Sequence, residues 1–175
     1  MKKKVGKIVR RRRLEAKTNY SKRIKLLKGN SPRIVFRKSN KYIIAQLIIS
    51  KEAQDKIKFG ITSKKLLDYG WPKEAVNSLK TLPASYLTGL LMGKKVSDKE
   101  KVIVDFGMNR NVHKSKVYAF IKGLVDAGID VTEKENIFPD KERLEGKHLK
   151  TDVISKKFDE IKNKIGGGKW VMVIV

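Results

Sequence analysis

The chain has 175 residues and a mass of 20.0 kDa, and its 42 Lys and Arg residues against 18 Asp and Glu residues give a formal net charge of +24 at pH 7. The absence of Cys excludes disulfides and thiolate zinc sites, and the longest apolar runs, residues 42–49 and 170–175, are too short to cross a bilayer. No apolar segment follows the basic residues 1–9, so we expect no secretory signal and a cytoplasmic protein.

Residues 1–31 are expected to form a basic arm, because they contain 8 Lys and 5 Arg residues against a single acidic residue, Glu15. This excess is larger than solubility requires and predicts a polyanionic partner. Residues 1–9 lack periodicity and are expected to become ordered only on that partner. An apolar stripe predicts one short helix over residues 12–28, ended by Gly29-Asn30. The stripe consists of Leu14, Tyr20, Ile24 and Leu27.

An antiparallel meander of three short strands is predicted at the start of an α/β core domain, residues 32–132. Runs rich in β-branched residues, with close turns between them, cover residues 33–38, 42–50 and 56–61. In the first strand apolar side chains alternate with Arg33, Val35 and Arg37, which predicts one polar face. Ser39-Asn40 is expected to form the first turn, since Asn tolerates a positive φ.

Helical segments and two more strands are expected to complete the core domain. Capping residues and apolar spacing predict helices over residues 64–69, 72–79, 83–94 and 116–127. A buried strand is expected over residues 102–106 and a short one over residues 129–131, after a helix that Ser115 caps and Gly128 closes. This order predicts an α/β fold with a mixed five-stranded sheet and flanking helices.

Residues 133–175 are expected to form a C-terminal helical segment and tail. Residues 133–149 are polar and give no clear pattern, whereas apolar residues at helical spacing predict a helix over residues 153–165. Gly166-Gly167-Gly168 is typical of a flexible hinge. Residues 170–175 are expected either to form an edge strand or to bury against a partner.

The arm carries side chains that suit RNA. Arginine makes bidentate hydrogen bonds to phosphates and stacks on unstacked bases. In an extended segment Arg10–Arg13 would point to alternate sides and bridge two backbone strands, whereas a helix would place Lys17, Arg23 and Lys28 along one groove. Tyr20 would either stack on a base or anchor the helix.

Two other functions are compatible with the residues alone. Asp105 with Asp126 or Asp130 would suit a ribonuclease H-like nuclease that uses Mg²⁺, although two-metal chemistry needs several converging carboxylates. A basic architectural DNA-binding protein would also fit this charge, because the contribution of phosphate contacts to affinity does not depend on the nucleotide sequence. His113 and His148 have no partner motif, so no metal site is expected.

Several blocks of sequence, in order between residues 10 and 130, point to a known family. They include Arg11–Tyr20, Arg37–Lys41, Ala45–Leu47, Tyr69–Trp71, Pro83–Leu91, Val104–Gly107, Ser115–Val117 and Asp126–Asp130. In these blocks the chain resembles the archaeal and eukaryotic type of universal large-subunit ribosomal protein eighteen, the family that binds 5S ribosomal RNA. The match thins beyond residue 135.

The resemblance implies a ribonuclease H-like motif, no enzymatic activity and no cofactor. It implies a structural constituent of the large ribosomal subunit that binds 5S rRNA and helps attach it to large-subunit rRNA at the central protuberance, beside neighbouring ribosomal proteins. In the family, the basic N-terminal segment and the strand and turn around residues 37–41 meet the 5S rRNA. The RNA-binding residues expected here are Arg10, Arg11, Arg12, Arg13, Lys17, Tyr20, Arg23, Lys25, Lys28, Arg37, Lys38, Ser39, Asn40 and Lys41.

Overall fold

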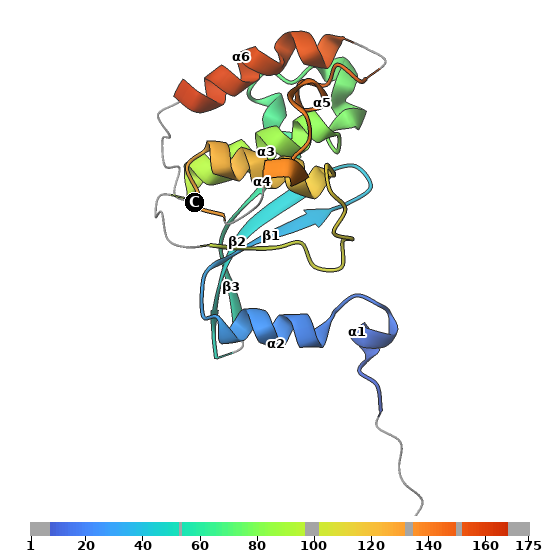
Figure 1. Ribbon diagram of the computed structural model, residues 1–175, viewed down its shortest axis with the longest axis vertical. Helices are drawn as coiled ribbons and strands as arrows, with labels where there is room; N and C mark the ends of the chain where they lie inside the picture. Colours follow the sequence, from blue (N-terminus) through green and yellow to red (C-terminus); the bar gives the residue numbers. More distant parts are fainter. Residues whose placement is uncertain (1–7, 53, 97–101, 132–134, 150–151, 168–175) are drawn as a thin grey trace, which may run out of the picture.

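A four-stranded sheet with the strand order β3-β2-β1-β4 lies at the centre of the computed structural model (Figure 1). β1 (Arg33–Lys38), β2 (Ile43–Lys51) and β3 (Gln54–Thr62) form the expected antiparallel meander, and β4 (Ile103–Asp105) pairs in parallel with β1. The sheet is therefore mixed, as expected. The structure describes residues 8–52, 54–96, 102–131, 135–149 and 152–167.

Residues 129–131, expected to form a fifth strand, are not a strand in the structure. Gly128 has a φ of +95° just after α4 (Lys116–Asp126), and the N–H of Ile129 donates to the carbonyl of Leu124 at 3.1 Å. This N–H closes the helix, as in a Schellman motif, and is not free for a strand ladder. Within the described residues the sheet has four strands, and the likeness to a ribonuclease H-like motif stays a prediction.

The inner position of β1 buries both faces of the strand. Arg33 and Val35, expected on a polar face, are only 2% and 4% exposed. β2 and β4 flank β1, while α2 (Tyr20–Lys28) lies on the opposite side of the sheet from α3 (Leu82–Lys95) and α4 (Figure 1). The expectation of one polar face is therefore wrong for these two residues. Arg37, near the end of the strand, keeps about half of its side chain exposed.

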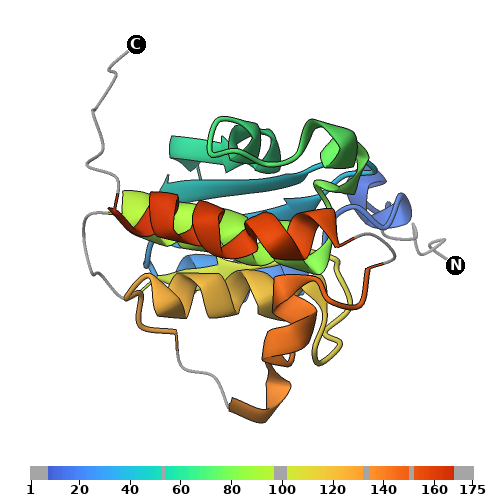
Figure 2. The ribbon, with the colours of Figure 1, turned by 90° about the horizontal axis from the view of Figure 1, so that it is seen from above.

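Two closely packed helices, α3 and α4, cover the other face of the sheet (Figure 2). A Cβ added to Gly89 would lie 2.2 Å from the carbonyl oxygen of Phe120, and one added to Gly123 would lie 2.2 Å from that of Tyr86. Only glycine permits so close an approach. α6 (Val153–Gly167) packs on α3 as an outer layer. Fully buried core side chains include Ile34, Phe36, Leu87, Leu91, Phe120 and Leu124.

Two further helices lie near positions where helices were expected, but they differ from expectation in type. η1 (Ser63–Leu67) and η2 (Lys73–Ser78) are short 3-10 helices. The Ser63 hydroxyl accepts a hydrogen bond from the N–H of Ile43 at 3.1 Å, so it fixes β2 and does not cap η1. η3 (Glu135–Ile137) and α5 (Lys141–Glu145) occupy the region that gave no clear pattern. No helix among the described residues is long and apolar enough to span a membrane.

The arm contains two helices where one was expected. α1 (Arg11–Leu14) ends before Ala16, whose positive φ of +50° is incompatible with a continuous helix. α2 then starts after Asn19, whose side chain accepts a hydrogen bond from the N–H of Lys22 at 3.1 Å and so caps the new helix. As expected, α2 ends at Gly29-Asn30. Residues 1–7 and 168–175 lie outside the described residues, so the expectations for them stay predictions, as do the domain boundaries. Gly166 and Gly167, expected in a flexible hinge, instead belong to α6 (Val153–Gly167).

Candidate nucleic-acid interface

α1 presents a cluster of guanidinium groups to solvent, from Arg11, Arg12 and Arg13. Successive side chains of a helix point about 100° apart, so these three spread around α1 and do not alternate as in an extended segment. Arg12 Nε donates to Thr18 Oγ1 at 2.9 Å, and Arg11 Nε lies 3.6 Å from Glu15 Oε1. Such exposed contacts contribute little free energy. All three guanidinium groups therefore remain accessible to phosphates.

Tyr20 connects the beginning of the arm to α2. The Arg10 guanidinium lies over the Tyr20 ring, with its central carbon 4.7 Å from the ring centroid, in a cation–π contact. Arg10 thereby covers one face of the ring. This contact supports the anchoring role of Tyr20, and stacking of a base on this ring stays a prediction.

The lysines of the arm divide into paired and unpaired groups. Lys17 Nζ lies 2.7 Å from Glu15 Oε2, a salt bridge within the connection between α1 and α2. Lys25 and Lys28 are exposed on α2 and make no salt bridge with any residue that the structure describes. These two ammonium groups are the unpaired members of the lysines expected to bind RNA along the arm.

Arg23 links α2 to the sheet through a network centred on Asp55. Arg23 Nη2 donates to Asp55 Oδ2 at 2.9 Å, and Arg33 Nη2 donates to Asp55 Oδ1 at 2.7 Å. The Ser50 hydroxyl donates to the same Oδ1 at 2.6 Å and accepts from Arg33 at 2.9 Å. Partial burial raises the pKa of Asp55. The hydrogen bonds from Ser50 and Arg23 and the charges of the two guanidinium groups lower it by more, so the pKa lies below its usual value of 3.8. The network joins α2 to the hairpin of β2 and β3.

Lys22 forms a second tether, between α2 and the chain that follows β4. Its Nζ lies 4.1 Å from the centroid of the Phe106 ring and donates to the carbonyl of Gly107 at 3.4 Å. These tethers were not expected from the sequence, because the bonded residues lie 32 positions apart for Arg23 and 85 for Lys22. Arg23, expected to bind RNA, is thus engaged within the protein and positions the arm.

Replacing Asp55 with Asn should lower the free energy of unfolding by about 2 kcal/mol, because it weakens hydrogen bonds between charged groups and leaves the buried Arg33 with only the more distant Asp105 carboxylate, 3.7 Å away. The measurement is denaturant unfolding at neutral pH. Asp130→Asn is the matched control, since Asp130 is exposed and makes no salt bridge with a described residue. We expect it to change stability by less than about 0.5 kcal/mol.

The same substitution has a pH signature. Because the pKa of Asp55 is lowered in the folded protein, its ionised carboxylate stabilises the fold at pH values above 3.8, and this contribution is lost as the pH falls through the lower folded-state pKa. The stability difference between the parent chain and Asp55→Asn should therefore shrink in acid. A difference that stays constant from neutral pH down to the acid limb would contradict the role given to the Asp55 charge.

The turn between β1 and β2 presents a second group of candidate residues. The Ser39 N–H donates to the Tyr42 carbonyl at 2.9 Å, and the Tyr42 N–H donates to Ser39 Oγ at 2.8 Å. Ser39 therefore builds the turn, and Asn40 takes part in it without a positive φ. Lys38 and Lys41 are exposed on either side and make no salt bridge within the described part of the chain.

Arg37 is only partly available at this turn. Its Nη1 donates to the carbonyl of Phe36 at 3.0 Å, and its Nη2 lies 3.8 Å from Asp105 Oδ2, while 48% of its side chain is exposed.

The β1–β2 turn, α1 and the chain after β4 all lie at the right of both Figure 1 and Figure 2. The fold thus brings α1 and the turn to the same side of the molecule.

The carboxylates considered for a magnesium site have separate partners. Asp105 accepts a hydrogen bond from the N–H of Gly107 at 2.8 Å and lies close to the guanidinium groups of Arg33 and Arg37. Asp126, on α4, accepts one from the hydroxyl of Tyr86 at 2.8 Å. Among the described residues no group of three or more His, Cys, Asp or Glu side chains is placed to hold a metal ion. The geometry gives no support to two-metal chemistry at Asp105.

Comparisons with known proteins point in one direction. A family model described as "Ribosomal large subunit proteins 60S L5, and 50S L18" matches residues 4–102. The chain is 43% identical over 145 residues to Large ribosomal subunit protein uL18 of Korarchaeum cryptofilum, covering 82% of this chain and 72% of that protein. It is 40% identical over 163 residues to the uL18 of Methanothrix thermoacetophila, covering 90% and 94%. It is 40% identical over 145 residues to that of Halobacterium salinarum, covering 82% and 77%.

Proposed function

The chain belongs to the family of ribosomal large subunit proteins 60S L5 and 50S L18, and on that premise we propose that it binds 5S rRNA as a non-enzymatic structural constituent of the large subunit in the cytoplasmic ribosome. In this role it helps attach 5S rRNA to the large-subunit rRNA at the central protuberance. There it also touches neighbouring ribosomal proteins.

The placement of α1 and the β1–β2 turn on the same side of the molecule is the observation that carries this proposal (Figure 1). α1 contributes Arg11–Arg13, and the turn contributes Lys38 and Lys41, all exposed. Phosphates attract both groups, and their attraction gives a salt-dependent affinity that steers association. Two separate basic elements on one protein bind a folded RNA at two places and so fix its orientation.

The tethers of α2 explain how a short basic helix acts as part of a rigid surface. Arg23 and Lys22 hold α2 to Asp55 and to the chain that follows β4. Because α2 is held in this way, the arginines of α1 start from a restricted position, and less conformational entropy is lost when RNA binds. The family role requires such a fixed orientation, since the protein joins two RNA molecules.

A competition experiment separates RNA recognition from general binding of polyanions. Labelled 5S rRNA bound to the full chain is challenged with unlabelled duplex DNA that carries the same number of phosphates, and with an unrelated duplex RNA of equal length. We expect both competitors to be at least about 100-fold weaker than unlabelled 5S rRNA, because specific complexes exceed the non-specific phosphate term by a large factor. Equal competition by the DNA would favour an architectural DNA-binding protein instead.

A further inference from the structure

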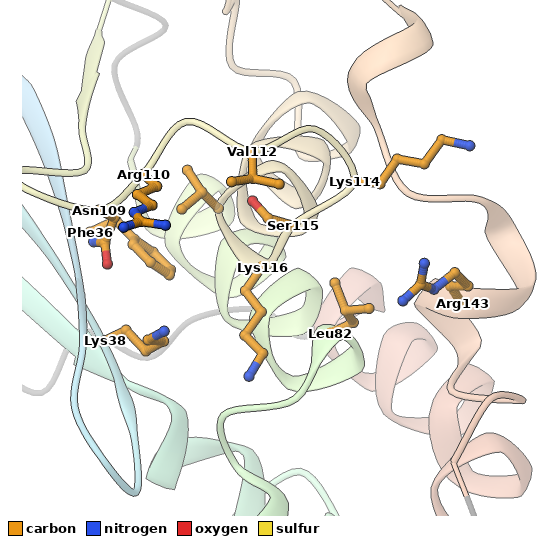
Figure 3. Close-up of a pocket in the computed structure, with 11 residues that line it drawn as sticks. Phe36, Lys38, Leu82, Asn109, Arg110, Val112, Lys114, Ser115, Lys116 and Arg143 are labelled. Carbon is orange, nitrogen blue, oxygen red and sulfur yellow. The ribbon is translucent and has the colours of Figure 1, made fainter.

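A cavity of about 450 Å³ opens at the start of α4, beside the end of β1 (Figure 3). Its basic lining side chains come from four separate segments: Lys38 from β1, Arg110 and Lys114 from the chain after β4, Lys116 from α4 and Arg143 from α5. Apolar side chains, among them Leu82, complete the wall. The volume lies in the range of small-ligand sites and exceeds the needs of a single ion.

Among the described residues, four of the five basic side chains that line the cavity have no acidic partner. Within the described residues, Lys38, Arg110, Lys116 and Arg143 make no salt bridge. Lys114, which also lines the cavity, differs, because its Nζ binds Asp140 at 3.0 Å and its side chain points away from the other cations (Figure 3).

The pKa of Lys116 is lowered from its ordinary value. Burial lowers the pKa first, and the charges of Lys38 and Lys80 lower it further. An anion in the cavity would relieve the repulsion between these ammonium groups.

The start of α4 adds hydrogen-bond donors to this field. The first turn of an α-helix leaves backbone N–H groups without intrahelical acceptors, and the helix dipole places partial positive charge there. Ser115 occupies the expected N-cap position, but its side chain makes no capping hydrogen bond. Ser115 is one of the residues that line the cavity, and its Oγ is buried and has no hydrogen-bond partner among the described residues. A buried hydroxyl without a partner is costly, and an anionic oxygen beside it would accept a hydrogen bond from it.

We propose that this cavity binds a backbone phosphate of the RNA that also contacts the β1–β2 turn. Lys38 belongs both to that turn and to the cavity lining, so a strand that passes over the turn reaches the cavity without leaving the protein surface. The phosphate would lie at the start of α4, with the Ser115 hydroxyl as a donor and Lys116 and Arg143 as counter-charges. The inference rests on the proposed function and adds a third contact to those of α1 and the turn.

The test uses the full chain carrying Lys116→Gln and Arg143→Gln, titrated with 5S rRNA at several salt concentrations. We expect about a 10-fold loss of affinity and a salt slope smaller by about 1. The matched control is Lys156→Gln with Lys157→Gln, which removes the same charge from two exposed residues of α6. It should bind nearly as the parent does. Equal melting temperatures for the three chains show that each is folded.

A second measurement distinguishes RNA from free phosphate. Inorganic phosphate is added to the chain without RNA, and the backbone amide resonances of Lys116 and Val117 are followed by NMR. If phosphate shifts these resonances but the double variant binds RNA like its control, the cavity takes free phosphate and the RNA contact is overturned. If neither effect occurs, the cavity is no anion site. If the parent chain itself fails to bind 5S rRNA, the proposed function fails, and the RNA contact at the cavity fails with it.

Discussion

Replacing Arg11, Arg12 and Arg13 together with Gln should weaken binding to 5S rRNA by about 100-fold and reduce the slope of log K against log salt by about 2. The three guanidinium groups are exposed on one helical turn and make only weak contacts within the protein. Each arginine that contacts a phosphate releases counterions from the RNA on binding. When the contact is lost, those counterions stay bound, so the affinity and the salt slope fall together. The measurement is a filter-binding titration of the full chain at several salt concentrations.

The control for this prediction removes the same charge elsewhere. Lys156, Lys157 and Lys164 are exposed on α6, which lies at the opposite end of the molecule from α1 (Figure 1). Replacing these three lysines with Gln should change the affinity by only a few-fold, through the long-range field of the protein. Equal losses in the two triple variants would mean that net charge, and not the arm, determines binding.

Replacing Gly123 with Ala should reduce the free energy of unfolding by about 3 kcal/mol, or prevent folding. The added Cβ would lie 2.2 Å from the carbonyl oxygen of Tyr86 and 2.8 Å from the backbone nitrogen of Leu90. Both are backbone atoms that no side-chain rotation moves away, so α3 and α4 must separate and open the core beside the sheet. Denaturant unfolding followed by circular dichroism measures the effect.

The control substitution is Gly166→Ala, near the end of α6. No atom lies within 4 Å of a Cβ added there, and alanine in a helix is favoured over glycine by up to about 1 kcal/mol. We therefore expect this variant to be as stable as the parent chain or slightly more stable. A Gly123→Ala chain with the stability of the Gly166→Ala chain would contradict the close helix crossing.

Patterns among residues close together in the sequence were sufficient to predict most of the strands and the longer helices. The meander of β1 to β3 followed from β-branched runs and close turns, and α3, α4 and α6 followed from apolar residues at helical spacing. The break in the arm was missed, because the apolar stripe has members on both sides of Ala16, while the positive φ of Ala16 depends on the surrounding chain. The strand at residues 129–131 was wrong because the N–H of Ile129 closes α4.

The candidate interface was predictable in composition and only partly in arrangement. Arg11–Arg13 and Lys41 are exposed, as a binding role requires. Arg23 and Ser39 instead make contacts within the protein, since their partners become visible only once the hairpin and the turn have formed. The cations that line the cavity were not grouped in advance, because Lys38, Arg110, Lys116 and Arg143 lie on segments that are separate in sequence.

The central claim, that the arm and the β1–β2 turn bind 5S rRNA at two places, is tested most directly by a hydroxyl-radical footprint on that RNA. Three full-length chains are compared: the parent, the Arg11→Gln, Arg12→Gln and Arg13→Gln variant, and a Lys38→Gln and Lys41→Gln variant. The account predicts two separate protected stretches with the parent chain, of which each variant loses a different one. The same protection pattern with all three chains, or no protection with the parent, would contradict it.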